Sequence, residues 1–317
     1  MMTVINGDAP STPGPPVRRR RTWLVRIVRP LVLGYLALTI IVGCMQSRLI
    51  FPGASMRGSP ESHVDAPRGC DLVPLRTRDG DQVYALFGKA LTPHGQPRSD
   101  AASRPTLIYF YGNATMMAYT LDEFAQFRRL GANVAVAEYA GYGISSGKPS
   151  EKSFYATADA VYDYVIARKD IDPKQIIPTG WSIGGGVAID LAHRRPAAGV
   201  ATFSAFTSMS AMARHVIPIL PVSLFLKHKF DNQAKIGDLA VPIFQAHGTH
   251  DEIIPFWMNA RLAAAAKAPV TVVPVEGAGH NDIFDVGGDD LIQKFGRFIE
   301  GVHASRDSAT TTAGSQR

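Results

Sequence analysis

A glycine-flanked serine is the feature that most constrains this sequence. Residues 180–185 read Gly-Trp-Ser-Ile-Gly-Gly and follow the apolar run Ile176–Thr179. A serine with small residues two positions to either side, between a strand and a helix, is typical of the sharp turn called a nucleophile elbow. A side chain at Gly180 or Gly184 would clash with the neighbouring strand or helix. The helix that follows would point its first N–H groups at a site where negative charge develops. The motif therefore predicts that Ser182 is a nucleophile.

Two downstream segments supply the partners that such a serine needs. They are His247–Pro255, after the apolar stretch Val241–Ala246, and Gly277–Asp282, after Val270–Val275. A serine hydroxyl is a weak nucleophile at neutral pH and needs a base within hydrogen-bond reach. An imidazole can take that proton, and a carboxylate can hold the imidazole in the right tautomer. We therefore expect a catalytic triad of Ser182, His280 and Asp251.

Other titratable side chains lie close to these positions in the sequence. Three acids are alternatives to Asp251: Glu252, Asp282 and Asp285. His247 and His250 are expected to be structural loop residues, because their spacing in a loop does not suggest a metal site. Neither of the two cysteines, Cys44 and Cys70, has the spacing of a metal site or forms a disulfide framework. The expected chemistry needs no metal or organic cofactor.

The alternation of strands and helices predicts the fold class. From residue 69 to 301 apolar strands alternate with helices, which indicates an α/β domain with a mostly parallel sheet and helices on both faces. Its first two strands, Leu72–Arg76 and Gln82–Phe87, form a hairpin through Asp79 and Gly80. The long apolar stretch at about residues 205–241, interrupted by prolines, is expected to be a small helical cap over the sheet's C-terminal edge, where open α/β sheets bind ligands. A plain packing helix with a long loop is the alternative.

The N-terminal residues differ in composition from the rest. We expect a disordered basic arm over 1–21, a membrane anchor or signal segment over 22–45, a connector over 46–68 and a disordered tail over 302–317. Spanning a bilayer takes about 20 apolar residues, and 22–45 just meets this if two interrupting arginines reach the headgroups. The positive-inside rule then places the arginine cluster in the cytoplasm and the folded domain outside it. A cleaved lipoprotein signal ending at Cys44, and a buried helix of a soluble protein, are alternatives.

The charge distribution excludes one class of partner. The net charge is +6, but residues 1–30 carry six arginines and one acid, so the rest is nearly neutral. A basic face for nucleic acid is therefore not expected. The expected partners are a small-molecule or lipid ester as substrate and a membrane through the N-terminal segment. No feature of the sequence indicates an oligomeric state.

The stabilisation of an oxyanion requires two main-chain donors. In this architecture one is the N–H after the nucleophile, here Ile183, and the other comes from the loop after the third strand. That loop reads Tyr111-Gly112-Asn113-Ala114, in which Gly112 allows the close turn. We therefore expect Asn113 and Ile183 to donate their backbone N–H groups.

Together these motifs resemble the α/β-hydrolase superfamily, in its serine-hydrolase branch with an N-terminal membrane segment. The resemblance covers residues 46–300 and includes three further motifs: Arg48–Pro52, Tyr139–Gly147 (like Tyr-Arg-Gly-Tyr-Gly-x-Ser-x-Gly) and Ser204–Ser208. The family's oxyanion loop commonly reads His-Gly-Asn-Ala-Gly, whereas Tyr111 and Thr115 replace its ends here. Ala140 stands where arginine is common. The backbone donors survive these changes.

The resemblance implies hydrolysis of an ester, thioester or lipid by an acyl-enzyme route. An apolar cap favours an ester or thioester with an apolar acyl group, as in lysophospholipase-like enzymes. An aminopeptidase-like peptidase is an alternative, but it would need an acidic cap residue, and Met209–Phe230 contains none. A non-catalytic scaffold on the same fold is the second alternative.

Overall fold

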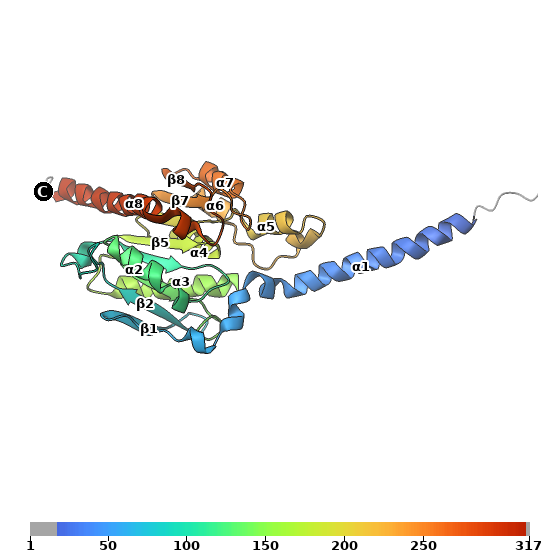
Figure 1. The fold of residues 1–317 in the computed structure, drawn as a ribbon, viewed down its shortest axis with the longest axis horizontal. Coiled ribbons are helices and arrows are strands. Elements are labelled where there is room, and N and C mark those ends of the chain that lie inside the picture. The colour runs from blue at the N-terminus through green and yellow to red at the C-terminus, as the bar shows by residue number, and fades with distance from the viewer. Residues whose placement is uncertain (1–17, 315–317) are drawn as a thin grey trace, which may run out of the picture. The chain divides into compact units, whose positions relative to one another are not determined.

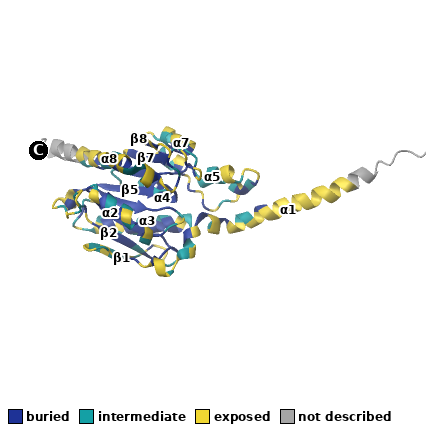
Figure 2. Cartoon of the chain, viewed as in Figure 1, coloured by how far each residue is buried: buried dark blue, intermediate teal, exposed yellow. Residues whose placement is uncertain are grey.

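The computed structural model describes residues 18–314, which fall into two compact units divided between Cys44 and Met45. Helix α1 (Arg18–Ile50) begins in the first unit and ends in the second. Its segment Trp23–Ile50 has a mean hydropathy of 2.0 over an 18-residue window and exposes its apolar side chains almost throughout (Figure 2). With 28 residues it exceeds the roughly 20 that cross a bilayer. By length and composition, this one helix is therefore able to be a membrane anchor or a signal segment.

The second unit is built on an eight-stranded sheet in the order β1-β2-β4-β3-β5-β6-β7-β8 (Figure 1). The strands are β1 (Cys70–Arg76), β2 (Gln82–Gly88), β3 (Thr106–Phe110), β4 (Asn133–Glu138), β5 (Ile176–Trp181), β6 (Val200–Phe203), β7 (Ile243–Gly248) and β8 (Val270–Val275). Strand β2 pairs antiparallel with β1 and β4, and the other pairs are parallel. The mostly parallel α/β fold expected from the sequence is confirmed.

Helices cover both faces of this sheet. After α1, the helices of the described chain are α2 (Leu121–Arg129), α3 (Glu151–Ala167), α4 (Ile183–Arg194), α5 (Met209–Val216), α6 (Asn232–Ile236), α7 (Trp257–Ala265) and α8 (Ile283–Gly314), of which α5 lies in the segment between β6 and β7. On one face α2 meets α8 through the rings of Phe127 and Phe295, whose centroids are 5.3 Å apart. On the other face α4 packs against α3 and α6, and α6 packs against α7. Helix α3 begins with a capping box in which Ser150 and Ser153 bond each other's backbone N–H.

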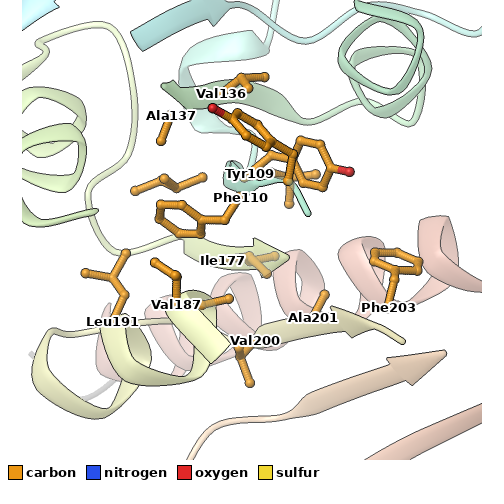
Figure 3. Close-up of a cluster of buried hydrophobic side chains, with 14 of the residues drawn as sticks. Tyr109, Phe110, Val136, Ala137, Ile177, Val187, Leu191, Val200, Ala201 and Phe203 are labelled. Carbon is orange, nitrogen blue, oxygen red and sulfur yellow. The ribbon is translucent and has the colours of Figure 1, made fainter. Parts of the chain in front are cut away.

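The side chains of successive strand residues point to opposite faces of the sheet, and both faces carry apolar side chains. In β3 the ring of Tyr109 packs against Phe127 of α2 at 5.2 Å. The next residue, Phe110, stacks on Tyr139, on the face that α3 and α4 cover. Figure 3 shows Phe110 in the cluster that includes Val187 of α4. Since successive side chains point to opposite faces, a strand buried on both sides is apolar throughout.

The stretch between β6 and β7 forms the cap-like segment. It contains α5, the short 3-10 helix η5 (Pro221–Leu224) and α6. Ser208 caps the N-terminus of α5, and its hydroxyl accepts from the N–H of Ala211 at 3.1 Å. No residue of α5 is buried, so this helix lies on the surface of the second unit.

Several boundaries differ from the sequence-based expectations. The connector 46–68 begins with the last turn of α1 and continues as two 3-10 helices, η1 (Pro52–Met56) and η2 (Pro60–Ser62). The segment 302–317, expected to be a disordered tail, is helical as far as Gly314, because α8 continues past the packed residue Val302. Of the expected disordered arm, residues 18–21 belong to α1, and 1–17 lie outside the described residues.

Candidate active site

Ser182 lies at the turn between β5 and α4 in a strained conformation, with φ 57° and ψ −121°. A non-glycine residue rarely adopts a positive φ, so surrounding structure must hold it. The Ser182 N–H donates to the carbonyl of Phe203 in β6 at 2.8 Å. A Cβ on Gly180 would lie 2.1 Å from the carbonyl oxygen of Gly184, and one on Gly184 would lie 1.9 Å from that of Phe110. Both glycines are therefore required by close backbone contact.

The three expected triad side chains lie within hydrogen-bond distance of one another. His280 places Nε2 3.0 Å from the Ser182 hydroxyl and Nδ1 2.8 Å from the Asp251 carboxylate. All three residues are buried, and the His280 ring stacks on Trp181. The segments come from three strand ends, after β5, β7 and β8, at one edge of the sheet. The arrangement can pass a proton between the serine and the imidazole.

The Asp251 carboxylate is held ionised by several donors. Burial disfavours the charge, but hydrogen bonds from His247 and His280 outweigh it and hold the pKa of Asp251 well below its ordinary value. The second carboxylate oxygen accepts the N–H groups of Ile253 and Ile254 at 3.0 and 2.7 Å. An ionised Asp251 carboxylate can only accept hydrogen bonds, so we place the ring proton of His280 on Nδ1, which donates to it. Its Nε2 is then free to accept the serine proton.

His247, expected to be a structural loop residue, lies instead in β7, and the sequence did not reveal its place in the site. Its ring is fully buried, and Nε2 lies 2.8 Å from the carbonyl oxygen of Ile254 and 3.2 Å from the Asp251 carboxylate. Since a carbonyl only accepts, Nε2 carries the proton and also faces Asp251. His247 and His280 therefore both face the same oxygen, Oδ2, of the Asp251 carboxylate. The only local signal was its position four residues before Asp251. His250, by contrast, is exposed.

The alternative acids are not in the place of Asp251. Asp282 accepts the Gly279 N–H at 2.7 Å and so stabilises the loop that carries His280. Glu252 and Asp285 are both exposed, and among the described residues the carboxylate that contacts the imidazole is that of Asp251. Across the part of the chain that the structure describes, no group of three His, Cys, Asp or Glu side chains could hold a metal ion.

The loop after β3 lies beside the nucleophile. A Cβ built on Gly112 would lie 3.0 Å from the Trp181 ring and 3.6 Å from the Cβ of Ser182. Asn113 is fixed by its side chain, which donates to the Ile50 carbonyl at 2.9 Å, and by its carbonyl, which accepts the Tyr142 hydroxyl at 2.8 Å. Ile183 is the first residue of α4, where backbone N–H groups have no partner within the helix. The N–H groups of Asn113 and Ile183 are therefore candidates to receive an oxyanion.

Tyr111, which departs from the family pattern, has a buried acidic partner. Its hydroxyl forms a short hydrogen bond with Oε1 of Glu138 at the end of β4, and the Met117 N–H lies 3.4 Å from the same oxygen. Among the described residues Oε2 of Glu138 has no hydrogen-bond partner. Burial raises the pKa of Glu138 to about 7, although these two hydrogen bonds oppose the rise. The hydrogen bond between Tyr111 and Glu138 thus holds the first residue of the loop after β3 in place.

Comparisons with known proteins place the chain among enzymes of this fold. It is 31% identical over 261 residues to an uncharacterised protein of Mycobacterium tuberculosis strain H37Rv, covering 82% of this chain and 89% of the relative. It is 34% identical over 209 residues to alpha/beta hydrolase domain-containing protein 17B of Xenopus laevis, covering 66% and 68%. The Homo sapiens protein of that name is 32% identical over the same shares. No family model matches the chain.

Solved structures share the fold at lower identity. An alpha-beta hydrolase of Vibrio vulnificus has a TM-score of 0.62 and 20% identity, covering 78% of this chain and 92% of its own. An esterase of Pyrococcus furiosus has a TM-score of 0.58 and 16% identity, covering 73% and 90%. At these identities the solved structures show a shared fold only, whereas the similarity to the 17B proteins is one of sequence. By its sequence and its fold, the chain belongs to the α/β-hydrolase family.

Proposed function

We propose that this hydrolase is a membrane-tethered serine hydrolase that cleaves a carboxylic ester or thioester through an acyl-enzyme intermediate. The observation that carries the proposal is the continuous chain of contacts from the Ser182 hydroxyl through His280 to Asp251, at 3.0 and 2.8 Å. A strained nucleophile, a base and a buried carboxylate in this order are what acyl transfer requires.

The first half of the reaction forms the acyl-enzyme. The Ser182 oxygen attacks the ester carbonyl carbon, its proton moves to Nε2 of His280, and the carbonyl oxygen becomes an anion. The ionised Asp251 stabilises the imidazolium that results. When the intermediate collapses, the bond to the leaving alcohol or thiol breaks, and Nε2 returns the proton to that group. The acyl group remains on Ser182.

The second half hydrolyses this intermediate. A water molecule takes the place of the leaving group, gives its proton to Nε2 and attacks the same carbonyl carbon. The carboxylic acid leaves when the proton returns to the Ser182 oxygen. In both halves we assign the backbone N–H groups of Asn113 and Ile183 to the oxyanion. Loss of one such donor typically costs about 3 kcal/mol of transition-state stabilisation.

The composition of the cap favours a substrate with an apolar acyl group. The segment Met209–Phe230 contains no aspartate or glutamate. An aminopeptidase would need a carboxylate there for the free amine of its substrate, so this alternative lacks its recognition residue. The cap follows β6, whose last residue, Phe203, accepts the Ser182 N–H. The cap segment thus follows the strand that holds the nucleophile's backbone.

A fluorophosphonate probe tests the nucleophile. It is expected to label the wild-type chain, and Ser182→Ala is expected to remove both the labelling and the turnover of p-nitrophenyl esters. Ser204→Ala is the matched control, because Ser204 is a buried serine at the end of the neighbouring strand whose hydroxyl has no partner among the described residues. Labelling that persists in Ser182→Ala would place the nucleophile elsewhere.

The tether is a separate part of the proposal. We assign residues 22–45, the apolar part of α1, to an uncleaved membrane anchor, with the arginines before it in the cytoplasm and the catalytic unit on the other side. Carbonate extraction should leave the chain in the membrane fraction. Protease added outside right-side-out vesicles or spheroplasts should digest the catalytic unit. Release by carbonate, or a shortened chain that begins at Cys44, would contradict the uncleaved anchor.

A further inference from the structure

We propose that the exposed apolar side of the cap docks on the same bilayer that holds α1, an inference that rests on the membrane tether proposed above. Val216, Leu224 and Phe225, here called the cap face, are 64%, 78% and 61% exposed. Figure 2 shows α5 and the turn after it coloured mainly as exposed or intermediate, unlike the buried strands. Large apolar side chains exposed close together indicate an interaction surface.

The cap is held against the first residues that follow the apolar run of α1. The Gln46 side chain donates to the Phe225 carbonyl at 3.3 Å and accepts the Lys227 N–H at 2.7 Å. The Ser47 hydroxyl lies 2.9 Å from Nε2 of His228. Gln46 and His228 are both buried. These contacts, all within the second unit, join residues about 180 positions apart in the chain.

The height of the cap face above the bilayer follows from these contacts. In an anchored chain, Gln46 and Ser47 lie at the headgroups, since they are the first polar residues after the apolar run ending at Met45. The backbone of Phe225 is one side-chain length from Gln46. It is therefore at headgroup level too, whatever direction α1 takes. Side chains of the cap face can then reach the acyl boundary, as those of interfacial helices do.

The charges around the cap face indicate which lipids it meets. Arg214, Lys227 and Lys229 are exposed there, and the segment Met209–Phe230 has no acid. Two carboxylates adjoin the segment: Glu151 accepts the N–H groups of Lys229 and Phe230 at 2.6 and 2.9 Å, and Asp231 caps α6 by accepting the Ala234 N–H. Basic side chains next to a membrane surface are attracted to anionic headgroups. The cap face therefore fits a bilayer that contains anionic phospholipid.

The test places a reporter on the cap face of the full chain. In a Cys44→Ser, Cys70→Ser background, Leu224→Cys and Phe225→Cys are labelled with an environment-sensitive fluorophore. Val272→Cys on β8 is the matched control, because Val272 is also an exposed apolar residue, 43% exposed. Each protein is reconstituted into vesicles of equimolar phosphatidylcholine and phosphatidylglycerol that carry a nitroxide quencher on the acyl chains.

Labels at 224 and 225 are expected to shift to shorter wavelength and to be quenched severalfold more strongly than the label at 272. Equal quenching at 224 and 272 would overturn the proposal. So would a wavelength shift in detergent that grows with protein concentration, since it would assign the cap face to a second copy of the chain. Equal quenching at 224 in pure phosphatidylcholine would overturn the role of the basic residues. Release of the protein from the vesicles by carbonate would contradict the membrane anchor rather than the docking of the cap face. None of these measurements depends on the activity of Ser182.

Discussion

Replacing Glu138 by glutamine is expected to remove a pH dependence from the stability of the fold. Burial raises the pKa of Glu138 to about 7 from an ordinary value of 4.5. A folded-state pKa above the unfolded value means that the neutral carboxyl is favoured in the folded chain. Its contribution to stability is complete below pH 4.5 and is lost as the pH rises through about 7. Glutamine stays neutral throughout.

The size of the effect follows from that pKa. A rise from 4.5 to about 7 corresponds to roughly 3 kcal/mol, at about 1.4 kcal/mol per pH unit. The free energy of unfolding of Glu138→Gln, minus that of the wild type, should therefore increase by about 3 kcal/mol between about pH 4 and pH 9. Taking this difference cancels the titration of the other groups, which both proteins share.

Chemical denaturation of the full chain in detergent micelles, followed by tryptophan fluorescence, measures this difference. Glu276→Gln is the control, because Glu276 is an exposed carboxylate in the same unit. Its difference from the wild type should stay nearly constant over the same pH range. If the Glu138→Gln difference were also constant, Glu138 would ionise equally in folded and unfolded chains. The argument from its burial would then be refuted.

Three further outcomes are expected. Asp251→Asn should lower kcat for a p-nitrophenyl ester by about 10³- to 10⁴-fold, because the wrong His280 tautomer is favoured; an unchanged kcat would refute the role of Asp251. Gly184→Ala should prevent folding, since its Cβ would lie 1.9 Å from the Phe110 carbonyl oxygen, whereas Gly301→Ala has no neighbour within 4 Å and should fold; equal soluble yields would contradict this. Gln46→Ala removes the two hydrogen bonds to Phe225 and Lys227 and should therefore speed proteolysis of the cap near Phe225, measured by mass spectrometry of the fragments. Unchanged cleavage would show that these hydrogen bonds are not needed to hold the cap.

The features that were predictable from the sequence depend on neighbours in the chain. The glycines at 180 and 184 predict the strained turn at Ser182, because only a residue without a Cβ fits at these two positions. The apolar stretch Val270–Val275 coincides with β8. The end of α8 was less predictable: a segment with no core-forming pattern stays helical after Val302, in continuation of a packed helix.

The features that the sequence could not supply join residues that are distant in the chain. Tyr111 and Glu138 meet because β3 and β4 are neighbours in the sheet, and Gln46 meets Phe225 because the cap folds back on the end of α1. His247 supports Asp251 from within the core. The sequence thus determined the local backbone geometry and the kinds of reactive side chain. Only the tertiary structure decided which buried groups surround them, since sheet order and packing set those distances.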